Sequence, residues 1–325
     1  MFEFVNSISS DKIPDIYFTY EYGKCTEITD NGIWECAIWN LNEGFIPYLK
    51  KSINNNFYDL CSPYGYNGIY VQQSEKIKEC FDEFIHEAKK RNYVSFFIRF
   101  SPYLITNIFT HPQIYRKTST FGISLQINMT NKDHLRMVRK AKKNGFIYKF
   151  IEKIEYGHIL LFQTLYYQTM KRLNAKQYYF FSTNYFQKLY ELCHNYLSFV
   201  GVWKENKLIA CLLVFCYKPY IHYHLGASDE EYLSYGINNL VHQAVIEWAI
   251  IKKYTMYHLG GGIYENDGLH QFKKRISNIQ YNYYQGKIII NQEIYSLLSN
   301  KLSITDFFPP YRNSENVVLS NCGTL

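Results

Sequence analysis

The best candidates for a functional site, judged by residue type and spacing, are a lysine and three glycines near the carboxyl end of the chain. Gly260, Gly261 and Gly262 follow a short apolar stretch, and Lys273 comes later, directly after Phe272. Consecutive glycines let the backbone turn sharply and approach a ligand closely, because they lack a Cβ atom. A strand, a glycine turn and a short helix present backbone amides and one side chain at a strand's carboxyl end. The spacing alone fits either such a ligand site or a tight connection that carries a surface lysine.

A proton acceptor is harder to assign than the cation. His222, Tyr223 and His224 lie on one expected strand, so the two histidines share a face and Tyr223 takes the other. Histidine titrates nearest neutrality, although buried histidines are more often structural. Glu265 and Asp267 flank the glycine turn, and Asp267 suits a helix cap better than a catalyst.

The start of the main helix in the second half of the chain also carries polar groups. Asn238, Asn239 and His242 lie in its first turns. Such side chains either hold a polar group of a ligand or cap the helix. The sequence leaves both interpretations open.

Four segments, in the same order, resemble the FemAB-like branch of the GNAT acyltransferase superfamily. Residues 258–275 resemble its C-terminal signature, in which a strand ends in a Leu-Gly-Gly turn before a Phe-Lys pair. Residues 58–68 resemble its Asp…Pro-Tyr-Gly-Tyr segment, and residues 98–104 its Arg-Phe-x-Pro-Leu stretch. Residues 136–145 resemble its Arg-x-x-Arg-Lys-Ala helix. The segments containing Pro-Tyr-Gly-Tyr and Arg-Phe-x-Pro are most similar to members found with surface-polysaccharide genes.

This resemblance implies an α/β (α+β) fold with tandem GNAT-like domains, each a mixed, mostly antiparallel sheet flanked by helices. The expected division is a degraded N-terminal domain at residues 1–145, a catalytic domain at 146–302, and an irregular tail at 303–325 that packs on the first domain. The order of elements expected in the second half, helix and strand in alternation, favours the same fold class.

The resemblance also implies roles for individual residues. The ammonium of Lys273, beside Phe272, is expected near the reacting carbonyl, and Tyr223 and His224 are added as catalytic candidates. Residues of the remaining motifs are expected to bind substrate: Gly260, Gly261, Gly262, Asn238, Asn239, Tyr64, Tyr66, Arg99, Arg139 and Lys140. No Cys/His spacing indicates a metal site.

Hydrophobic periodicity and turn residues predict the elements that position these groups. In the first half we expect strands at 16–22 and 34–40 joined by a turn at 30–32, a helix at 74–92, and strands at 93–100 and 121–129. In the second half we expect helices at 130–144, 156–174, 185–195 and 236–252, and strands at 146–152, 197–203, 207–216, 220–226 and 255–259.

Composition limits the class of protein. A chain of 325 residues can form two domains, and 47% hydrophobic with 19% charged residues describes a globular protein. No stretch approaches the roughly 20 apolar residues of a membrane span, and the N-terminus lacks the pattern of a signal peptide. The eight cysteines form no Cys-x-x-Cys pair, which predicts reduced thiols and a cytoplasmic location.

The net charge of +7 is concentrated in one helix. Residues 132–149 hold seven Lys or Arg and a single Asp. This basic helix has three interpretations: a solvated face, a contact with phosphates of a nucleotide-linked or lipid-linked acceptor or of tRNA, or a contact with anionic lipid at the inner membrane surface.

The acyl donor remains open at this point. CoA-dependent GNAT enzymes hold the pyrophosphate with a glycine-rich loop before their main helix, whereas residues 228–239 contain three acids, one glycine and no arginine. Carboxylates there would repel a pyrophosphate, which favours aminoacyl-tRNA. The polysaccharide-associated resemblance favours acyl-CoA instead. No tightly bound cofactor is expected.

These observations predict an N-acyltransferase that moves an acyl or aminoacyl group to an amine of a cell-envelope precursor, either a surface polysaccharide or peptidoglycan. The expected acceptor is a nucleotide- or lipid-linked saccharide. Two alternatives are a non-catalytic module that binds nucleic acid or phosphate through the basic helix, and an inactive GNAT scaffold, because fold does not fix function.

Overall fold

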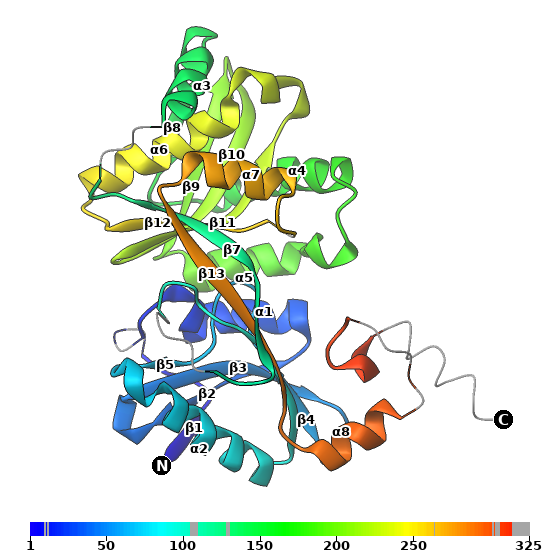
Figure 1. The fold of residues 1–325 in the computed structure, drawn as a ribbon. Coiled ribbons are helices and arrows are strands. Elements are labelled where there is room, and N and C mark those ends of the chain that lie inside the picture. Colours follow the sequence, from blue (N-terminus) through cyan, green and yellow to red (C-terminus); the bar gives the residue numbers. More distant parts are fainter. Residues whose placement is uncertain are drawn as a thin grey trace, which may run out of the picture. The chain divides into compact units, whose positions relative to one another are not determined.

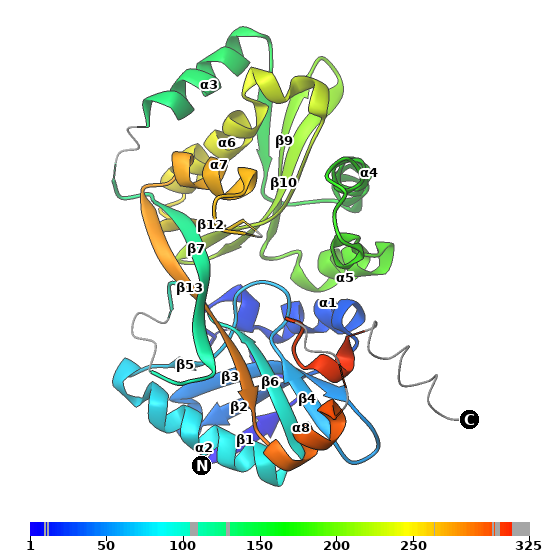
Figure 2. The ribbon, with the colours of Figure 1, turned by 45° about the vertical axis from the view of Figure 1, so that its right-hand side comes forward.

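The structure is a computed structural model that describes residues 1–9, 11, 13–104, 110–127, 131–262, 264–300, 302 and 306–313. The chain forms two compact units (Figures 1 and 2). The first comprises Met1–Lys117 and Tyr283–Leu325, and the second comprises Thr118–Asn282. Two long strands, β7 (Ile114–Ser124) and β13 (Ile279–Ile289), carry the chain between the units.

The first unit is a mixed sheet with helices. Its strand order is β1-β2-β3-β4-β6-β13, with β5 paired to β3. The strands are β1 (Phe2–Val5), β2 (Ile33–Trp39), β3 (Gly44–Ser52), β4 (Tyr58–Cys61), β5 (Tyr70–Val71) and β6 (Tyr93–Arg99), and the helices are α1 (Tyr20–Asp30), α2 (Ile77–Lys90) and α8 (Gln292–Ser299). Helix α2 buries Ile77, Phe81, Phe84 and Ala88 at helical spacing, and it confirms the helix expected at 74–92.

The second unit is a twisted sheet in the order β7-β12-β11-β10-β9-β8. Its other strands are β8 (Ile147–Ile151), β9 (Leu197–Lys204), β10 (Lys207–Tyr217), β11 (Tyr220–Ser228) and β12 (Met256–Gly260). Its helices are α3 (Lys132–Lys143), α4 (Tyr156–Arg172), α5 (Thr183–Cys193), α6 (Ile237–Ile251) and α7 (Gly268–Ile276). Strands β8 to β11 are antiparallel neighbours, whereas β11 and β12 are parallel.

Helices cover both faces of this second sheet. In Figure 2, α6 and α7 lie on one side of the strands, and α4 and α5 lie on the other. Helix α6 packs against β8 to β11 and buries Leu240, Val241, Ala244 and Val245 in the core of the unit. The mixed α/β class with mostly antiparallel sheets is therefore confirmed.

One expected hairpin is wrong. Residues 16–22 form a 3-10 turn and the first residues of helix α1, instead of a strand. The Thr19 side chain caps α1 by accepting a hydrogen bond from the Tyr22 amide, and Asn31 ends the helix at φ 50°. Tyr22 and Cys25 are buried along the helix, so capping and burial outweigh the β propensity of the aromatic residues.

The units differ from the domain ranges expected from the sequence. Residue 145 does not separate two units, because α3 packs on α6 and belongs with the second unit. Residues 283–302, which were expected in the second domain, complete the first unit through β13 and α8. In the tail, Tyr311 and Arg312 bind Asp59 of the first unit, while residues 303–305 and 314–325 lie outside the described part of the chain.

Candidate active site

The glycine turn lies where β12 leaves the sheet. Gly260 has φ +71°, a left-handed conformation that favours glycine, and it lies opposite Phe121 of β7. A Cβ atom on Gly261 would lie 2.7 Å from the Ser119 carbonyl oxygen. One on Gly262 would meet the Asp267 carboxylate. Gly260 is thus favoured by its backbone conformation, whereas Gly261 and Gly262 are favoured by close packing of the chain on itself.

Asp267 is a helix cap, as its position after the turn indicates. Its carboxylate accepts hydrogen bonds from the Tyr264 amide at 2.9 Å and the His270 amide at 2.7 Å. The bond from His270 satisfies an amide that the first turn of α7 leaves without a helical partner, and the bond from Tyr264 fastens the preceding turn to the cap. Asp267 therefore fixes where α7 begins and how its side chains point.

Lys273 is buried on the inner face of α7. Only 4% of the residue is exposed, and Nζ donates a 2.8 Å hydrogen bond to the Gly261 carbonyl oxygen. The same Nζ lies 4.7 Å from the centre of the Tyr223 ring. Burial lowers the pKa of the Lys273 ammonium to about 7, while the Asp267 charge acts weakly in the opposite direction. The interpretation of Lys273 as a solvated surface lysine does not hold.

Phe272 and Tyr223 lie beside this lysine. The Phe272 ring packs on His242 of α6, with the ring centres 5.6 Å apart, and His242 lies 5.4 Å from the Tyr223 ring. Burial and the neighbouring positive charges lower the pKa of His242 to about 3, and its Nδ1 is bonded to the Tyr257 hydroxyl at 2.8 Å. His242 is thus a neutral, hydrogen-bonded group that shapes the wall of the site.

The parallel pairing of β11 with β12 is short. The ladder runs from Tyr220–Met256 to His222–His258, while β11 itself continues to Ser228. Tyr223 is the first residue of β11 after this pairing, and the Lys273 ammonium lies over its ring. The candidate site therefore lies where the two strands part.

His224 is not brought to Lys273. Its Nε2 bonds the Tyr185 hydroxyl of α5 at 2.9 Å, and its ring packs against Phe215. Alternation along β11 puts Tyr223 on the α6 side of the sheet and His224 on the α5 side, as the expected alternation requires. Burial lowers the pKa of His224 to about 3. His222 shares that face and packs against His258.

The Pro-Tyr-Gly-Tyr loop lies in the first unit. Tyr66 packs edge-on against Tyr17 and Tyr283, and the Tyr64 carbonyl oxygen accepts a hydrogen bond from the Tyr22 hydroxyl. Arg99 donates to the Ser62 carbonyl oxygen at 2.7 Å and lies over the Phe97 ring. These contacts fix the shape of the loop.

Helix α3 covers the beginning of α6. Gly236, the N-terminal cap of α6, has φ +84°, and a Cβ atom there would lie 2.6 Å from the Met137 carbonyl oxygen. Lys140 donates to the Ser234 carbonyl oxygen at 2.8 Å, and Asn239 bonds the His134 ring at 3.1 Å. Asn239 therefore holds α3, while Asn238 is half-buried and Arg139 is exposed.

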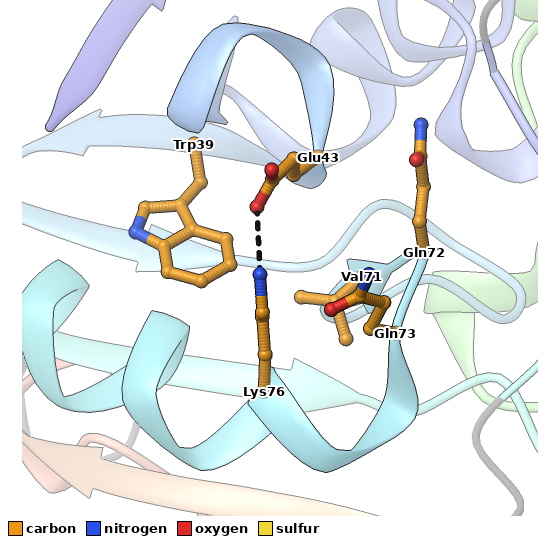
Figure 3. A pocket seen from close by; sticks show the side chains of 6 residues that line it. All are labelled: Trp39, Glu43, Val71, Gln72, Gln73 and Lys76. Carbon is orange, nitrogen blue, oxygen red and sulfur yellow. Dashed lines mark hydrogen bonds and ion pairs between the residues drawn. The ribbon is translucent and has the colours of Figure 1, made fainter.

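A surface hollow of the first unit contains none of the predicted site residues. It encloses about 220 Å³, its open mouth included (Figure 3). Its lining residues are Trp39, Glu43, Val71, Gln72, Gln73 and Lys76. Lys76 and Glu43 pair across it at 3.3 Å, so its charges neutralise each other.

The described part of the chain contains no cluster of three or more His, Cys, Asp or Glu residues that could hold a metal ion. The seven described cysteines are free thiols, and Cys322 lies outside the described residues. Among the helices described, none has the length and apolar character needed to cross a bilayer.

Sequence reasoning missed His270. It is 3% exposed and lies on the same buried face of α7 as Lys273. The spacing of three residues before Lys273 is the signal that could have identified it.

Comparison with known proteins identifies a domain and a fold. Residues 132–274 match the family described as an acetyltransferase (GNAT) domain. No curated protein matches the sequence. Among solved structures, FemX is 14% identical, with a TM-score of 0.67 over 91% of this chain and 99% of FemX. L-PGS from Bacillus licheniformis is 12% identical, with a TM-score of 0.56 over 81% of this chain and 86% of that chain.

A conserved protein of unknown function from Bacteroides thetaiotaomicron also shares the fold, at 11% identity and a TM-score of 0.58, over 89% of this chain and all of that one. The match to the GNAT family includes α3 to α7 and therefore the whole candidate site around Lys273. Residues 132–274 thus match an acetyltransferase (GNAT) domain, and the chain shares the fold of FemX, in agreement with the resemblance noted in the sequence.

Proposed function

We propose that this protein transfers an acyl or aminoacyl group to an amine of a cell-envelope precursor, with Lys273 stabilising the oxyanion. The observation that carries the proposal is the buried Lys273 ammonium, which has a neutral carbonyl oxygen as its hydrogen-bond partner and no carboxylate within ion-pair distance among the described residues. A buried cation without a counter-ion is costly, and catalytic sites commonly hold such groups.

The chemistry follows from this placement. An amine attacks the carbonyl carbon of an ester or thioester, and negative charge develops on the carbonyl oxygen. That oxygen would replace the Gly261 carbonyl as the acceptor of the Lys273 hydrogen bond. Because burial and the Tyr223 ring keep the ammonium away from water, its attraction for the developing charge is stronger than in water. The protein contributes position and charge, with no covalent intermediate.

The beginning of α6 bears on the choice of donor. A helix N-terminus is a natural binding site for a pyrophosphate, but here the Met137 carbonyl oxygen and the rest of α3 pack over it. Asp229, Glu230 and Glu231 precede this point and would repel a pyrophosphate. These contacts favour an aminoacyl ester, such as aminoacyl-tRNA, over acyl-CoA as the donor.

The likeness to FemX and L-PGS supports the choice of acceptor and of donor chemistry. A putative lysylphosphatidylglycerol synthetase domain from Agrobacterium fabrum, 12% identical, has a TM-score of 0.54 over 79% of this chain and 84% of that chain. A transfer of aminoacyl groups to envelope components is the function that these likenesses and the α6 contacts favour together. At these identities the comparison shows a shared fold, and the main chemical argument comes from the buried Lys273 ammonium.

A direct transfer assay tests the proposal. The purified protein is incubated with aminoacyl-tRNA or acyl-CoA and with nucleotide-linked or lipid-linked saccharide acceptors that carry an amine, and products are identified by mass spectrometry. We expect an amide product from the wild type and its loss in Lys273→Met. A wild type without product, or a variant that retains full turnover, would contradict the proposed function.

Calorimetry with acetyl-CoA tests the donor separately. The blocked N-terminus of α6 predicts weak or undetectable binding. A micromolar dissociation constant, which corresponds to about 8 kcal/mol, would restore acyl-CoA as the donor.

The alternative of a binding module rests on the basic helix α3. Part of its charge is already engaged, because Arg136 pairs with Asp133, Lys142 lies 3.8 Å from Glu247, and Lys140 bonds Ser234. This leaves fewer cations for phosphates than the sequence suggests. A module of this kind would lose RNA binding when α3 is changed and would form no product.

A further inference from the structure

Helix α7 buries polar side chains and exposes an apolar one. His270, Lys273 and Ile276 form its buried face, while Leu269 is 44% exposed. A short surface helix normally turns its apolar residues inward. Burying a titratable side chain costs free energy unless it is well paired, so this arrangement needs an explanation. The proposed function explains Lys273 and leaves His270 unexplained.

The His270 ring has neither nitrogen in a hydrogen bond within the described residues. Its ring lies edge-on against Phe121, with the centres 4.8 Å apart. Its backbone amide donates a hydrogen bond to the Asp267 cap. A buried polar atom left without a hydrogen-bond partner destabilises the fold. Such groups in a folded protein commonly mark a functional site or an unseen water.

Three other buried histidines of the second unit have hydrogen-bonded rings, whereas His222 and His258 each leave one ring nitrogen without a hydrogen bond to any described residue. His134 bonds Gln243 and Asn239, His224 bonds Tyr185, and His242 bonds Tyr257. The fold therefore supplies partners for buried imidazoles at these positions. His270 differs from them because neither of its ring nitrogens has a hydrogen-bond partner among the described residues.

His270 lies close in the fold to Lys273 and to the glycine turn. It precedes Lys273 by one helical turn on the same buried face. Its ring contacts Phe121, which pairs with Gly260 in the sheet. The next residue, Gly261, provides the carbonyl oxygen that bonds Lys273. His270 and Lys273 thus flank the same glycine turn.

We propose that His270 is the general base of the transfer that Lys273 assists, an inference that rests on the proposed function. The acceptor nitrogen forms a bond to the donor carbonyl carbon, and the His270 imidazole accepts the proton that this nitrogen loses. When the tetrahedral intermediate collapses, the bond to the leaving oxygen or sulfur breaks and the imidazolium returns the proton to it. Protons and charge balance without another reactant, while Lys273 holds the oxyanion.

His270→Gln tests this role through the pH profile. General-base catalysis typically contributes a hundredfold or more, so kcat should fall by about 10²-fold while KM stays nearly constant. The rising limb of kcat/KM with pH should disappear, because glutamine cannot accept the proton. His158→Gln is the control, since His158 caps α4 through the Glu155 amide. A His270→Gln enzyme with the wild-type kcat and pH profile would overturn the proposal.

Thermal unfolding of His270→Leu provides a second, independent readout. Replacing an unbonded buried imidazole by an apolar side chain should raise Tm by roughly 2–6 °C. His134→Leu is the matched contrast, and it should lower Tm because it leaves Gln243 and Asn239 without their partner. A lower Tm for His270→Leu, with turnover retained, would show that His270 is a structural residue.

Lys273→Met in the same transfer assay separates the two hypotheses. Loss of turnover in Lys273→Met but not in His270→Gln overturns the role of His270 and leaves the proposed function intact. Retained turnover in both variants overturns both. Loss in both, with the rising pH limb absent only from His270→Gln, supports both.

Discussion

Arg312 in the first unit and Lys273 in the second are both cations held against the protein interior. Arg312 donates a 2.5 Å hydrogen bond to the carboxylate of Asp59, which is 2% exposed, and also binds two backbone carbonyls. Lys273 has a backbone carbonyl as its partner, and Asp267 influences it only through longer-range attraction.

The same contrast holds for the buried acids of the first unit. Glu35 accepts hydrogen bonds from the Tyr48 and Tyr93 hydroxyls and pairs with Lys50. Asp59 also accepts from Ser95. These two carboxylates link distant segments of the chain, and each is paired with a cation, Lys50 for Glu35 and Arg312 for Asp59. In the second unit, Lys273 is left unbalanced, which lowers stability and prepares the site for developing negative charge.

The largest effect is expected at Lys273. In Lys273→Met, packing of the stem is kept and the charge is lost, so turnover should fall about a hundredfold to a thousandfold. Substrate affinity should change little, because the stabilised charge exists mainly in the transition state. Steady-state kinetics measures both quantities. Lys273→Arg should rescue only partly, because guanidinium is larger and planar. Full turnover in Lys273→Met would show that the charge of Lys273 is not used in catalysis.

In the first unit, removal of a charge should reduce stability instead of activity. Asp59→Asn leaves Arg312 without its counter-ion and should lower the free energy of unfolding by roughly 3 kcal/mol. Denaturant titration measures this change. Asp82→Asn is the control, since the exposed Asp82–Lys78 pair should contribute less than about 1 kcal/mol. Equal effects of the two variants would show that the tail contact is no stronger than a surface pair.

The smallest effect on stability is expected in helix α3. Changing Arg139 and Lys143 to Gln should alter unfolding by under about 0.5 kcal/mol, because both side chains are solvated. If they meet phosphates of the acceptor or donor, ligand affinity should fall and its salt dependence should flatten. Lys140→Gln should be measured separately, because Lys140 also bonds Ser234. Unchanged affinity over a salt series would leave α3 as a solvated helix.

Local patterns predicted the strand and helix that carry the glycine turn and Lys273 better than they predicted the fold around them. The Phe272–Lys273 pair and the glycine turn were identified because strand, turn and helix are coded within one short segment. Strand β13 was missed, although it pairs with β6, because its neighbours come from distant parts of the chain. The helix at 20–30 was missed because burial and capping by Thr19 outweigh local propensity.

The catalytic set shows a second limit. Alternation along β11 correctly separated His224 from Tyr223, but it could not show which face α7 covers. That depends on where α7 packs, which places Tyr223 beside Lys273 and leaves His224 with Tyr185. The spacing of His270 from Lys273 could have placed both on one face of α7, but the burial of its ring without hydrogen bonds is seen only in the packed structure.

The most direct test of Lys273 as a buried, unbalanced cation is the pH dependence of unfolding. Its pKa of about 7 in the folded protein lies below the ordinary lysine value of 10.5, so the unfolded chain binds more protons between these values. Stability should therefore rise with pH above about 7, by up to roughly 1.4 kcal/mol per pH unit from this group. The penalty is fully present below pH 7.

Denaturant titrations of the wild type and Lys273→Met between pH 6 and pH 9.5 measure this contribution as a difference. We predict that the variant is more stable than the wild type at pH 7 and that the difference shrinks as the pH rises. Two curves that remain parallel across this range, or a variant that is less stable at pH 7, would contradict the assignment of Lys273 as a buried and unbalanced cation.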